Sequence, residues 1–555
     1  MTDSHYHKDY PFGIAEQIDP DLYRNVVDIF DNFTKRFREK PAFSCMGHTM
    51  TYNDLDVMSA RFAAYLQNET DLKPCDRIAL QLPNILQFPT LIWGALRAGM
   101  VVVNTNPLYT EREMEHQFND SGAKMLVVYA GMAAQALRVQ PKTSIKKILV
   151  TEIADFHKQL KRWLVNTVVK RVKKMVPEYD TSRITPLNEA LSQGSKYRMN
   201  PVQREREDIA VLQYTGGTTG VAKGAMLTHR NLIANMMQSR EFFMVKLEEG
   251  QETFIAPLPL YHIYAFMVHG LLLSNTGNHS VLIPNPRDIP GFVKELSKWE
   301  YSGFAGLNTL FVALMNNPDF QKLDFSKLTF TLSGGMALTH DAAERWEKMT
   351  GSPIYEGYGM TETSPVISFN PPGKHQLGTI GLPLSSTAVK VVDDEGKEVA
   401  AGEPGELCAK GPQVMKGYWN RPEDTAKTID EEVYIHTGDI AVIQDDGFIK
   451  IVDRKKDMII VSGFNVYPNE VEDVVTSHPK VLEAAAIGIP DEKTGEAIKM
   501  FIVCNEEVSN EDLIAFCRER LTAYKVPRQF EVRTELPKTN VGKVLRRELR
   551  DEVTA

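Results

Sequence analysis

The sequence of 555 residues contains few cysteines and no metal-binding cysteine pattern. Its five cysteines are scattered and form no CxxC pair, which argues against a zinc site and against a disulfide framework. Unpaired cysteines are typical of a reducing compartment, so we expect a cytoplasmic protein.

Long apolar runs and an excess of positive charge are also missing. The most apolar stretch, residues 257–273, is interrupted by two prolines and two histidines, so we expect no membrane-spanning helix. The N-terminus is polar and lacks the apolar segment of a secretory signal, and the last residues match no lipidation signal. The 63 basic residues are outnumbered by 72 acidic ones, a formal net charge of −9, which argues against a nucleic-acid partner.

What remains is the composition of an ordinary globular protein, with 43% hydrophobic and 24% charged residues. At about 150 residues per domain, the length predicts roughly three to four folding units. Through the first two-thirds, short apolar runs alternate with helical patterns, which predicts a layered α/β architecture. Buried strands are expected at residues 78–83, 100–104, 124–130, 146–150, 208–214 and 328–335.

The pattern changes at about residue 380. From there to about residue 453, short apolar runs are separated by the turn signals DDEG, GEPGE and DDG, which predicts a small β-rich, barrel-like subdomain. The charged run at residues 453–457 marks the expected domain boundary. The last ~100 residues have the size of a separate small α+β domain.

One segment stands out by its charge. Residues 158–174 contain seven basic residues and no acidic ones, with apolar residues at helical spacing. This pattern predicts a basic amphipathic helix, which lies either on an anionic membrane surface or on its own domain as a solvated surface helix. In the membrane alternative Trp163 is the interfacial anchor, and the residues facing the headgroups are Lys161, Arg162, Lys170, Arg171, Lys173 and Lys174.

The strongest local motif is YTGGTTGVAKG, residues 214–224, which we expect to follow a strand and to precede a helix. Its glycines let backbone amides approach an anion, and Lys223 adds a positive charge. The pattern differs from a Walker A loop, because Ala222 and Gly224 flank the lysine. It predicts a polyphosphate-binding loop, with an ordinary flexible loop as the alternative.

Two further motifs and a lysine near the C-terminus supply candidate ligands. In EGYGMTET, Tyr358 offers its ring to a planar base and Glu362 offers an oxygen ligand suited to Mg²⁺. In HTGD, Asp439 can accept hydrogen bonds from both hydroxyls of a ribose. Lys543 follows a glycine in a loop expected before a basic helix. Each of these motifs alone is also compatible with an ordinary turn or a solvated side chain.

Together these motifs resemble the adenylate-forming superfamily of acyl-CoA synthetases, peptide adenylation domains and firefly-type luciferases. The superfamily's phosphate loop is usually [YF]TSGTTGxPKG, from which Gly216 and Ala222 depart without removing charge. From about Val27 to Val553 the chain is similar to the bacterial long-chain fatty acid–CoA ligases that feed β-oxidation. The segments that carry this similarity include PNPRDIPGFVKEL, LSGGMAL, GPQVMKGYWNRPE, VDRKKDMIIVSGFNVYPNEVEDVV and LPKTNVGKVLRRELRDE.

The resemblance implies a two-step reaction with ATP and coenzyme A as cosubstrates and Mg²⁺ as cofactor. A fatty acid carboxylate attacks the α-phosphorus of ATP, and coenzyme A then displaces AMP from the acyl-adenylate. Because long-chain fatty acids partition into bilayers, we expect peripheral attachment to the cytoplasmic face of the membrane; a homodimer is the family-based expectation. An acyl carrier protein as acceptor, another acyl chain length, and a catalytically inactive binding or membrane-interaction protein remain alternatives.

The resemblance also assigns roles to individual residues. Lys223, Thr361, Glu362 and Lys543 are the implied catalytic residues; Thr361 contacts the α-phosphate and Glu362 is the metal ligand. The β- and γ-phosphates are assigned to Thr215, Gly216, Gly217, Thr218, Thr219, Gly220 and Lys223. The base, the ribose and their surroundings are assigned to Gly334, Gly335, Met336, Glu356, Gly357, Tyr358, Gly359, Asp439 and Arg454.

Three further residues have roles implied by the resemblance. His262 matches a position beside the acyl pocket, although a structural histidine remains a serious alternative. Lys456 matches the hinge, which predicts an N-terminal domain of residues 1–453, a hinge at 454–456 and a mobile C-terminal domain of residues 457–555. Gly463 matches the glycine of the tunnel that admits coenzyme A, where a side chain would block passage.

Overall fold

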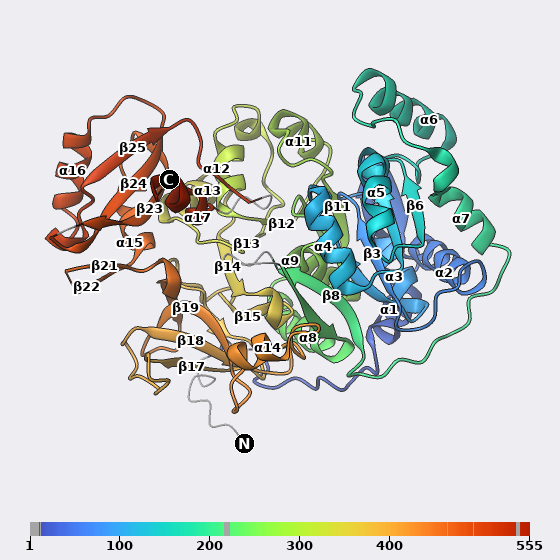
Figure 1. Ribbon diagram of the computed structural model, residues 1–555, viewed down its shortest axis with the longest axis horizontal. Helices are drawn as coiled ribbons and strands as arrows, with labels where there is room; N and C mark the ends of the chain where they lie inside the picture. The colour runs from blue at the N-terminus through green and yellow to red at the C-terminus, as the bar shows by residue number, and fades with distance from the viewer. Residues whose placement is uncertain are drawn as a thin grey trace.

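The computed structural model describes residues 10–11, 13–215, 222–462, 464–491, 493–539 and 544–554. These residues form four β-sheets with helices packed around them, as Figure 1 shows. Two large, mostly parallel sheets form the body of the molecule, and two smaller sheets contain most of the later strands. The α/β class predicted from the sequence is therefore confirmed, including the small C-terminal unit.

The first large sheet has seven strands in the order β7-β6-β5-β3-β4-β8-β9. All neighbours are parallel except β8 and β9, and the central strands are buried, which explains their continuous apolar runs. Five of the six strands expected from the sequence lie here. The strands are β3 (Arg77–Gln81), β4 (Val101–Asn104), β5 (Met125–Tyr129), β6 (Lys147–Thr151), β7 (Thr185–Pro186), β8 (Ile209–Thr215) and β9 (Lys223–Thr228).

The second large sheet has nine strands in the order β16-β15-β14-β13-β12-β10-β11-β1-β2. Its central strands are parallel, and the pairs at its two edges are antiparallel. The sixth expected strand is β13. The strands are β1 (Pro41–Cys45), β2 (His48–Thr51), β10 (Thr253–Ala256), β11 (His279–Leu282), β12 (Gly303–Gly306), β13 (Phe330–Gly334), β14 (Ile354–Gly359), β15 (Val366–Phe369) and β16 (Leu382–Pro383).

One large apolar core joins these two sheets and their helices. Helix α3 (Gln87–Arg97) is buried along its whole length and packs against α2 (Tyr52–Asn68). Gly94 permits this close approach, because a Cβ there would lie 2.7 Å from the Ser59 carbonyl oxygen. The other helices of this body are α1 (Val26–Arg36), α4 (Glu111–Ser121), α5 (Ala133–Val139), α7 (Leu187–Gly194), α8 (His229–Phe243), α9 (Ile263–Ala265), α10 (Leu273–Asn275), α11 (Ile289–Leu296), α12 (Asn308–Met315) and α13 (His340–Thr350).

The structure adds a strand that the sequence did not predict between the phosphate loop and the expected helix. This strand, β9, pairs antiparallel with β8 so that Thr215 lies opposite Lys223. Pairing with β9 satisfies the outer edge of β8, and it buries Ala225 and Leu227 in the core. Helix α8 begins only after Thr228, whose side chain forms a capping box with Asn231.

The predicted β-rich segment forms a four-stranded antiparallel sheet in chain order. Gly396 and Gly447 adopt positive φ angles of +80° and +85° in two of the expected turns, which favours glycine there. The short helix α14 (Pro422–Thr428) precedes the third strand. The strands are β17 (Ala388–Val392), β18 (Gly405–Lys410), β19 (Ile435–Ile443) and β20 (Ile449–Arg454).

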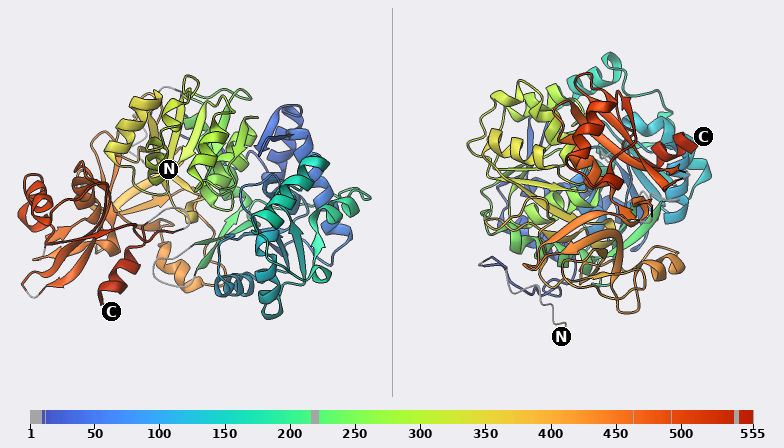
Figure 2. Two further views of the ribbon diagram at one scale, coloured as in Figure 1. Left: turned by 90° about the horizontal axis from the view of Figure 1, so that it is seen from above. Right: turned by 90° about the vertical axis from the view of Figure 1, so that its left-hand side faces the viewer.

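The last part of the chain forms its own five-stranded sheet and lies at one end of the molecule (Figure 2). The change of sheet occurs between Arg454, where β20 ends, and Ile459, where β21 begins. Ser509 caps α16 by accepting a hydrogen bond from the Asp512 amide. The elements are β21 (Ile459–Val461), β22 (Phe464–Val466), α15 (Pro468–Thr476), β23 (Val481–Asp491), β24 (Gly495–Cys504), α16 (Asn510–Arg518), β25 (Gln529–Arg533) and α17 (Arg546–Thr554).

The basic segment forms the helix expected from its spacing. Helix α6 (Gln159–Thr167) continues as a π-helical stretch at Val168–Val172, and no residue of either is buried. Figure 1 shows α6 projecting from the body at the upper right. Across the described part of the chain, every helix is too short or too polar to span a bilayer.

Candidate functional site

The ends of β13 and β14 form one wall of the candidate site. These strands are parallel neighbours in which Gly334 pairs with Gly357, and ligands commonly bind at the carboxyl ends of such strands. A Cβ on Gly359 would lie 1.9 Å from the Pro365 carbonyl oxygen, so the backbone turns there without room for a side chain. Gly335 has a φ of +84° and open space around it. The wall is therefore mostly bare backbone, which a flat group can approach closely.

Tyr358, on this wall, is hydrogen-bonded to the buried carboxylate of Asp439. Its hydroxyl donates a hydrogen bond to Asp439, whose other oxygen lies 2.8 Å from Nε of Arg454. Asp439 and Arg454 face each other across the β19–β20 pair, and Asp439 is only 5% exposed. Burial, reinforced by Asp439, raises the pKa of Tyr358, so the phenol stays protonated as a donor. Each Asp439 oxygen keeps a second lone pair for a further hydroxyl.

Glu362 lies in the short helical turn Thr361–Thr363 that follows this wall, with Thr361 beside it. It is 6% exposed, and its Oε1 accepts a hydrogen bond of 2.6 Å from the Tyr418 hydroxyl. Burial raises the pKa of Glu362, whereas Tyr418, Arg454 and Lys223 each lower it. Oε1 is engaged by Tyr418, which leaves Oε2 as the oxygen for a ligand.

Lys223, the first residue of β9, lies at the foot of the phosphate loop beside Tyr418. Its ammonium is 5.2 Å from the centroid of the Tyr418 ring and 3.0 Å from a carboxylate oxygen of Asp424. Tyr418 thus contacts the Lys223 ammonium with its ring and the Glu362 carboxylate with its hydroxyl. An arrangement of a lysine, a buried carboxylate and open backbone suits a polyphosphate with a bound divalent cation.

Glu356 lies on β14, and Met336 follows the end of β13. Burial raises the pKa of Glu356 to about 8, and the Leu338 amide opposes this shift by donating to the carboxylate. A carboxyl with this pKa is largely protonated at neutral pH, so Glu356 adds little negative charge to this wall. Met336 is partly buried against the large core.

Comparisons with known proteins identify this combination. A family model described as AMP-binding enzyme matches residues 30–419, and one described as AMP-binding enzyme C-terminal domain matches residues 470–543. The chain belongs to the AMP-binding enzyme family. The long-chain-fatty-acid–CoA ligase of Salmonella typhimurium is 52% identical over 547 residues, 98% of this chain and 97% of the relative. The ligase of the same name from Bacillus subtilis is 37% identical over 552 residues, 98% and 97% of the two chains.

Solved structures of AMP-binding enzymes share the fold. The anthranilate CoA ligase AuaEII in complex with anthranoyl-AMP has a TM-score of 0.85 at 26% identity and covers 97% of this chain and 99% of its own. ATP-bound MatB from Rhodopseudomonas palustris has a TM-score of 0.81 at 26% identity, covering 94% and 98%. The superfamily and fold expected from the sequence motifs are confirmed.

Seven residues that the sequence assigns to the site of this AMP-binding enzyme lie outside the described residues. Two of them, Gly463 and Lys543, belong to the C-terminal part. The other five belong to the phosphate loop: Gly216, Gly217, Thr218, Thr219 and Gly220.

His262 and Lys456 have structural surroundings that the sequence did not predict. The His262 side chain accepts a hydrogen bond of 3.3 Å from the Tyr264 amide and so caps α9, which fits the structural alternative. Its place beside an acyl pocket stays a prediction. Lys456 lies in the single helical turn Lys455–Asp457, whose Asp457 is ion-paired with Arg550 of α17 at 2.7 Å.

Sequence reasoning missed Tyr418 and Asp424 as members of the site. Both belong to the stretch GYWNRPED, and 56 residues separate Tyr418 from its partner Glu362. Backbone bonds bring this stretch to β9: Ala225 pairs with Tyr418, and the Trp419 amide donates to the Gly224 carbonyl at 2.8 Å. The available signal was that GYWNRPE already formed part of the family resemblance.

Proposed function

We propose that the chain is an ATP-dependent long-chain fatty acid–CoA ligase that forms an acyl-adenylate and then an acyl-CoA, releasing pyrophosphate and AMP. The observation that carries this proposal is the convergence of Lys223, Glu362 and the Tyr358–Asp439 pair on one site in a chain of this family. The long-chain substrate is supported by full-length similarity to ligases of that name. A role in supplying β-oxidation is part of the same proposal.

Adenylation brings a carboxylate onto the α-phosphorus of a polyanion, so neutralising charge is the main requirement. The carboxylate oxygen forms a bond to the α-phosphorus while the bond to the bridging oxygen of pyrophosphate breaks. In this proposal Lys223 neutralises the β- and γ-phosphates from the foot of the loop. Tyr358 and the glycine wall hold the base, and Asp439 with Arg454 holds the ribose.

The residues present fit a bound Mg²⁺ next to the phosphates. Glu362 is a buried carboxylate with one oxygen fixed by Tyr418, so its free oxygen has a defined direction. Among the described residues no group of three acidic, His or Cys side chains is suited to hold a metal alone. In the usual magnesium site, one or two carboxylates act together with phosphate oxygens and water. When bound, the cation would neutralise charge that develops on the phosphates.

The second step needs a different arrangement of the C-terminal part. We place the N-terminal domain at residues 1–453, the hinge at 454–456 with Lys456, and the mobile domain at 457–555. Lys543 then bridges the substrate carboxylate and the α-phosphate during adenylation and leaves the site when the domain rotates. The thiol of coenzyme A, reaching the carbonyl past Gly463, forms the thioester bond as the bond to AMP breaks.

Pyrophosphate release tests the first step of the proposed function. Purified protein with MgATP should release pyrophosphate only when fatty acid is added, and acyl-CoA should form only when coenzyme A is added. Activity that requires an acyl carrier protein in place of coenzyme A would favour the carrier-loading alternative. A series of acyl chains from short to long tests the chain-length assignment, and pyrophosphate release independent of fatty acid would contradict the proposal.

A pair of variants tests the two-orientation mechanism. Lys543→Ala should lose fatty-acid-dependent pyrophosphate release but still convert supplied acyl-adenylate and coenzyme A to acyl-CoA. Gly463→Leu should show the opposite pattern, because a leucine fills the passage for the thiol. Equal loss of both half-reactions in either variant, at an unchanged melting temperature, contradicts the assignment of that residue.

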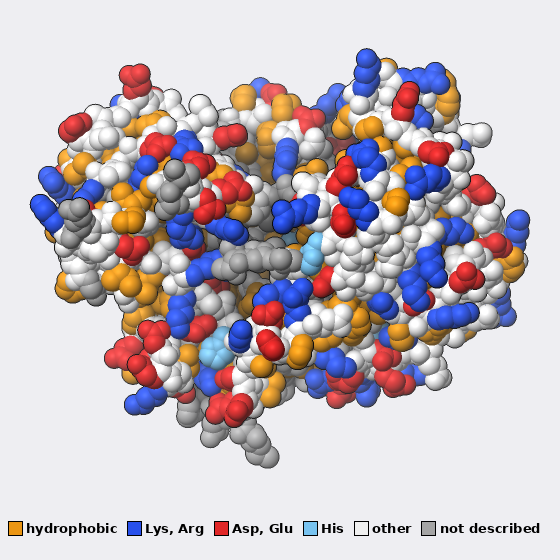
Figure 3. Space-filling view, in the orientation of Figure 1, with side chains coloured by type: hydrophobic (Ala, Val, Ile, Leu, Met, Phe, Trp, Pro, Cys, Tyr) orange, Lys and Arg blue, Asp and Glu red, His pale blue; other side chains and the backbone are white. Residues whose placement is uncertain are grey.

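We further propose that the segment 158–174, the basic arm, attaches the protein to the cytoplasmic face of the membrane. The observation in favour is the exposure of its apolar side chains: Leu160 is 79% exposed, Trp163 62% and Val172 72%. Figure 3 shows basic and hydrophobic side chains together on this projection. Apolar side chains flanked by basic ones are typical of helices that lie in the membrane interface.

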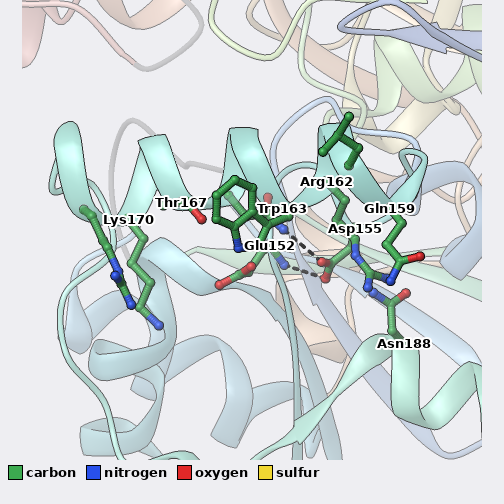
Figure 4. Close-up of a pocket in the computed structure, with 11 residues that line it drawn as sticks. Glu152, Asp155, Gln159, Arg162, Trp163, Thr167, Lys170 and Asn188 are labelled. Carbon is green, nitrogen blue, oxygen red and sulfur yellow. Dashed lines mark hydrogen bonds between the residues drawn. The ribbon is translucent and has the colours of Figure 1, made fainter.

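The basic residues of the arm differ in their partners on the body. A cavity of about 840 Å³ lies between the arm and the body, and Arg162, Lys170 and Arg171 line it together with Trp163, Glu152 and Asp155 (Figure 4). Lys161 donates a hydrogen bond to the Met46 carbonyl. Burial raises the pKa of Glu152, whereas Lys170 and Arg162 both lower it, so these two residues and Lys161 have partners on the body, and their contact with headgroups stays a prediction. Arg171, which also lines the cavity, is exposed like Lys173 and Lys174, and we assign these three residues to the headgroups.

The remaining partner predictions concern assembly. A homodimer stays the family-based proposal, and light scattering of the purified protein at several concentrations tests it. A mass of one chain at all concentrations would contradict it.

A further inference from the structure

The Lys223 ammonium, which should grip the phosphates, already has a carboxylate partner within the chain. Asp424, in the first turn of α14, lies 3.0 Å from it. We propose that Asp424 is a built-in competitor of the nucleotide: it holds Lys223 when no phosphate is present, and the β- and γ-phosphates of ATP displace it. This inference rests on the proposed function, because it takes Lys223 to be the phosphate-binding lysine.

The position of Asp424 is fixed by the backbone next to β9. The Met226 amide donates to the Gly417 carbonyl at 2.9 Å, and the Trp419 amide donates to the Gly224 carbonyl at 2.8 Å. The Tyr418 amide donates to the Thr425 hydroxyl at 2.9 Å, which ties the start of α14 to the same stretch. The carboxylate next in the chain to Thr425 is thus held at the foot of the phosphate loop.

The lysine can exchange partners without leaving the site. The side chains of Lys223 and Asp424 are 35% and 30% exposed, and the ion pair lowers the pKa of Asp424. A pair this accessible to water is weak, and a lysine on its flexible stem reorients readily. The Tyr418 ring also contacts the ammonium, and it can do so with either anion bound. ATP therefore replaces one carboxylate on Lys223, beside a tyrosine that keeps its contact with the ammonium.

The competition affects binding and release in opposite ways. Displacing Asp424 weakens the binding of every ligand that uses Lys223, namely ATP and pyrophosphate. AMP lacks the β- and γ-phosphates and is not affected. Recapture of Lys223 by Asp424 then favours the departure of pyrophosphate after adenylation. The carboxylate thus reduces affinity for the substrate and assists release of the first product.

The test is equilibrium binding of MgATP, pyrophosphate and AMP, without fatty acid, to variants at Asp424. Removing one partner of an exposed ion pair changes a binding affinity only modestly, so Asp424→Asn should lower the Kd for MgATP about two- to fivefold. Pyrophosphate should show the same gain and AMP no change. Asp424→Glu, which keeps the charge, should stay near the wild type. The gain should shrink as salt is raised, because salt screens the exposed pair.

Two controls make the result specific. Glu423→Gln removes an exposed carboxylate one residue earlier on the same helix and should leave all three affinities unchanged. In a double-mutant cycle, Lys223→Met with Asp424→Asn should bind MgATP like Lys223→Met alone. Melting temperatures of all variants check that they fold.

Each other outcome overturns the inference. Weaker MgATP binding by Asp424→Asn would mean that Asp424 orients Lys223 for the phosphates, and unchanged binding would mean that the pair is incidental. An equal gain for AMP would place the effect away from the β- and γ-phosphates. Failure of the proposed function is distinguishable, because the wild type itself would then bind no MgATP or release no pyrophosphate.

Discussion

Two charged regions of this protein differ in what surrounds their charges. At the nucleotide site, Glu362 and Asp439 are buried and each accepts a hydrogen bond from a tyrosine hydroxyl. In the basic arm, the charged and apolar side chains are mostly exposed, and Asn166 ties the arm to the body through Ala154 and Asp155. Buried, paired charges fix geometry for one ligand, whereas exposed charges attract a surface of opposite sign without fixing a pose.

The comparison leads to different expectations for substitution. At the site, a change of one atom should alter activity strongly and with a dependence on pH, because each buried carboxylate depends on a tyrosine hydroxyl that donates to it. In the arm, single changes should have little effect, and only combined changes should matter, with a dependence on salt. The following predictions test this contrast in order of decreasing effect on activity.

The largest effect is expected for Gly359→Ala. A Cβ would lie 1.9 Å from the Pro365 carbonyl oxygen, so the turn that positions Tyr358 and Glu362 must move. Such overpacking costs about 1–3 kcal/mol or more, and pyrophosphate release should be nearly lost. Thermal unfolding and the pyrophosphate assay measure the two effects.

Gly335→Ala is the matched control on the same wall. Its φ of +84° makes alanine strained, but a Cβ there meets no atom within 4 Å. The loss of stability should be about 1–2 kcal/mol. If the two variants lose equal stability, the close approach of the Pro365 carbonyl to Gly359 is not what constrains the backbone of this wall.

The sequence predicted the elements of this site better than its contacts. The buried strands leading to Thr215 and Gly334 were predictable because they are continuous apolar runs between helical patterns. Strand β9 was missed because its lysine and glycine leave only a short apolar run at residues 225–227, and its main reason for pairing is the edge of β8. Asp424 was missed because 201 residues separate it from Lys223, and no local pattern encodes an ion pair between distant segments.

Tyr418→Phe should have an intermediate effect on activity. It removes the hydrogen bond to Glu362, and an unsatisfied buried acceptor costs about 1–3 kcal/mol, so kcat/KM should fall roughly tenfold. The Tyr418 hydrogen bond lowers the pKa of Glu362, so its loss raises that pKa further. In the proposed function the ionised carboxylate of Glu362 is the metal ligand, so activity should then be lost at a higher pH as the solution is acidified.

The pH–rate profile separates this role from a structural one. The acidic limb of kcat/KM in Tyr418→Phe should lie at higher pH than in the wild type, at saturating Mg²⁺. The control is Tyr434→Phe, because Tyr434 contacts Lys390 and Lys410 in the four-stranded sheet. This variant should keep the acidic limb of kcat/KM at the pH of the wild type. A uniform loss of rate at every pH would mean that Tyr418 only supports the fold.

The smallest effect on activity is expected in the basic arm. Combined replacement of Arg171, Lys173 and Lys174 by glutamate should release the protein from anionic vesicles but leave its activity on micellar fatty acid unchanged. Each basic residue near such a surface contributes about 1 kcal/mol, so binding should fall by roughly two orders of magnitude at low salt. Lys170 is kept, because it faces Glu152 across the cavity.

Vesicle co-sedimentation across a range of salt concentrations measures this effect. Wild-type binding should be weak, should rise with anionic lipid and should fall with salt, because the net charge of −9 opposes docking. Combined replacement of Lys327, Lys348 and Lys397 by glutamate changes the net charge equally on exposed sites outside the arm and should release far less protein. If both triple variants lose binding equally, net charge governs it, and the arm is a solvated surface helix like any other.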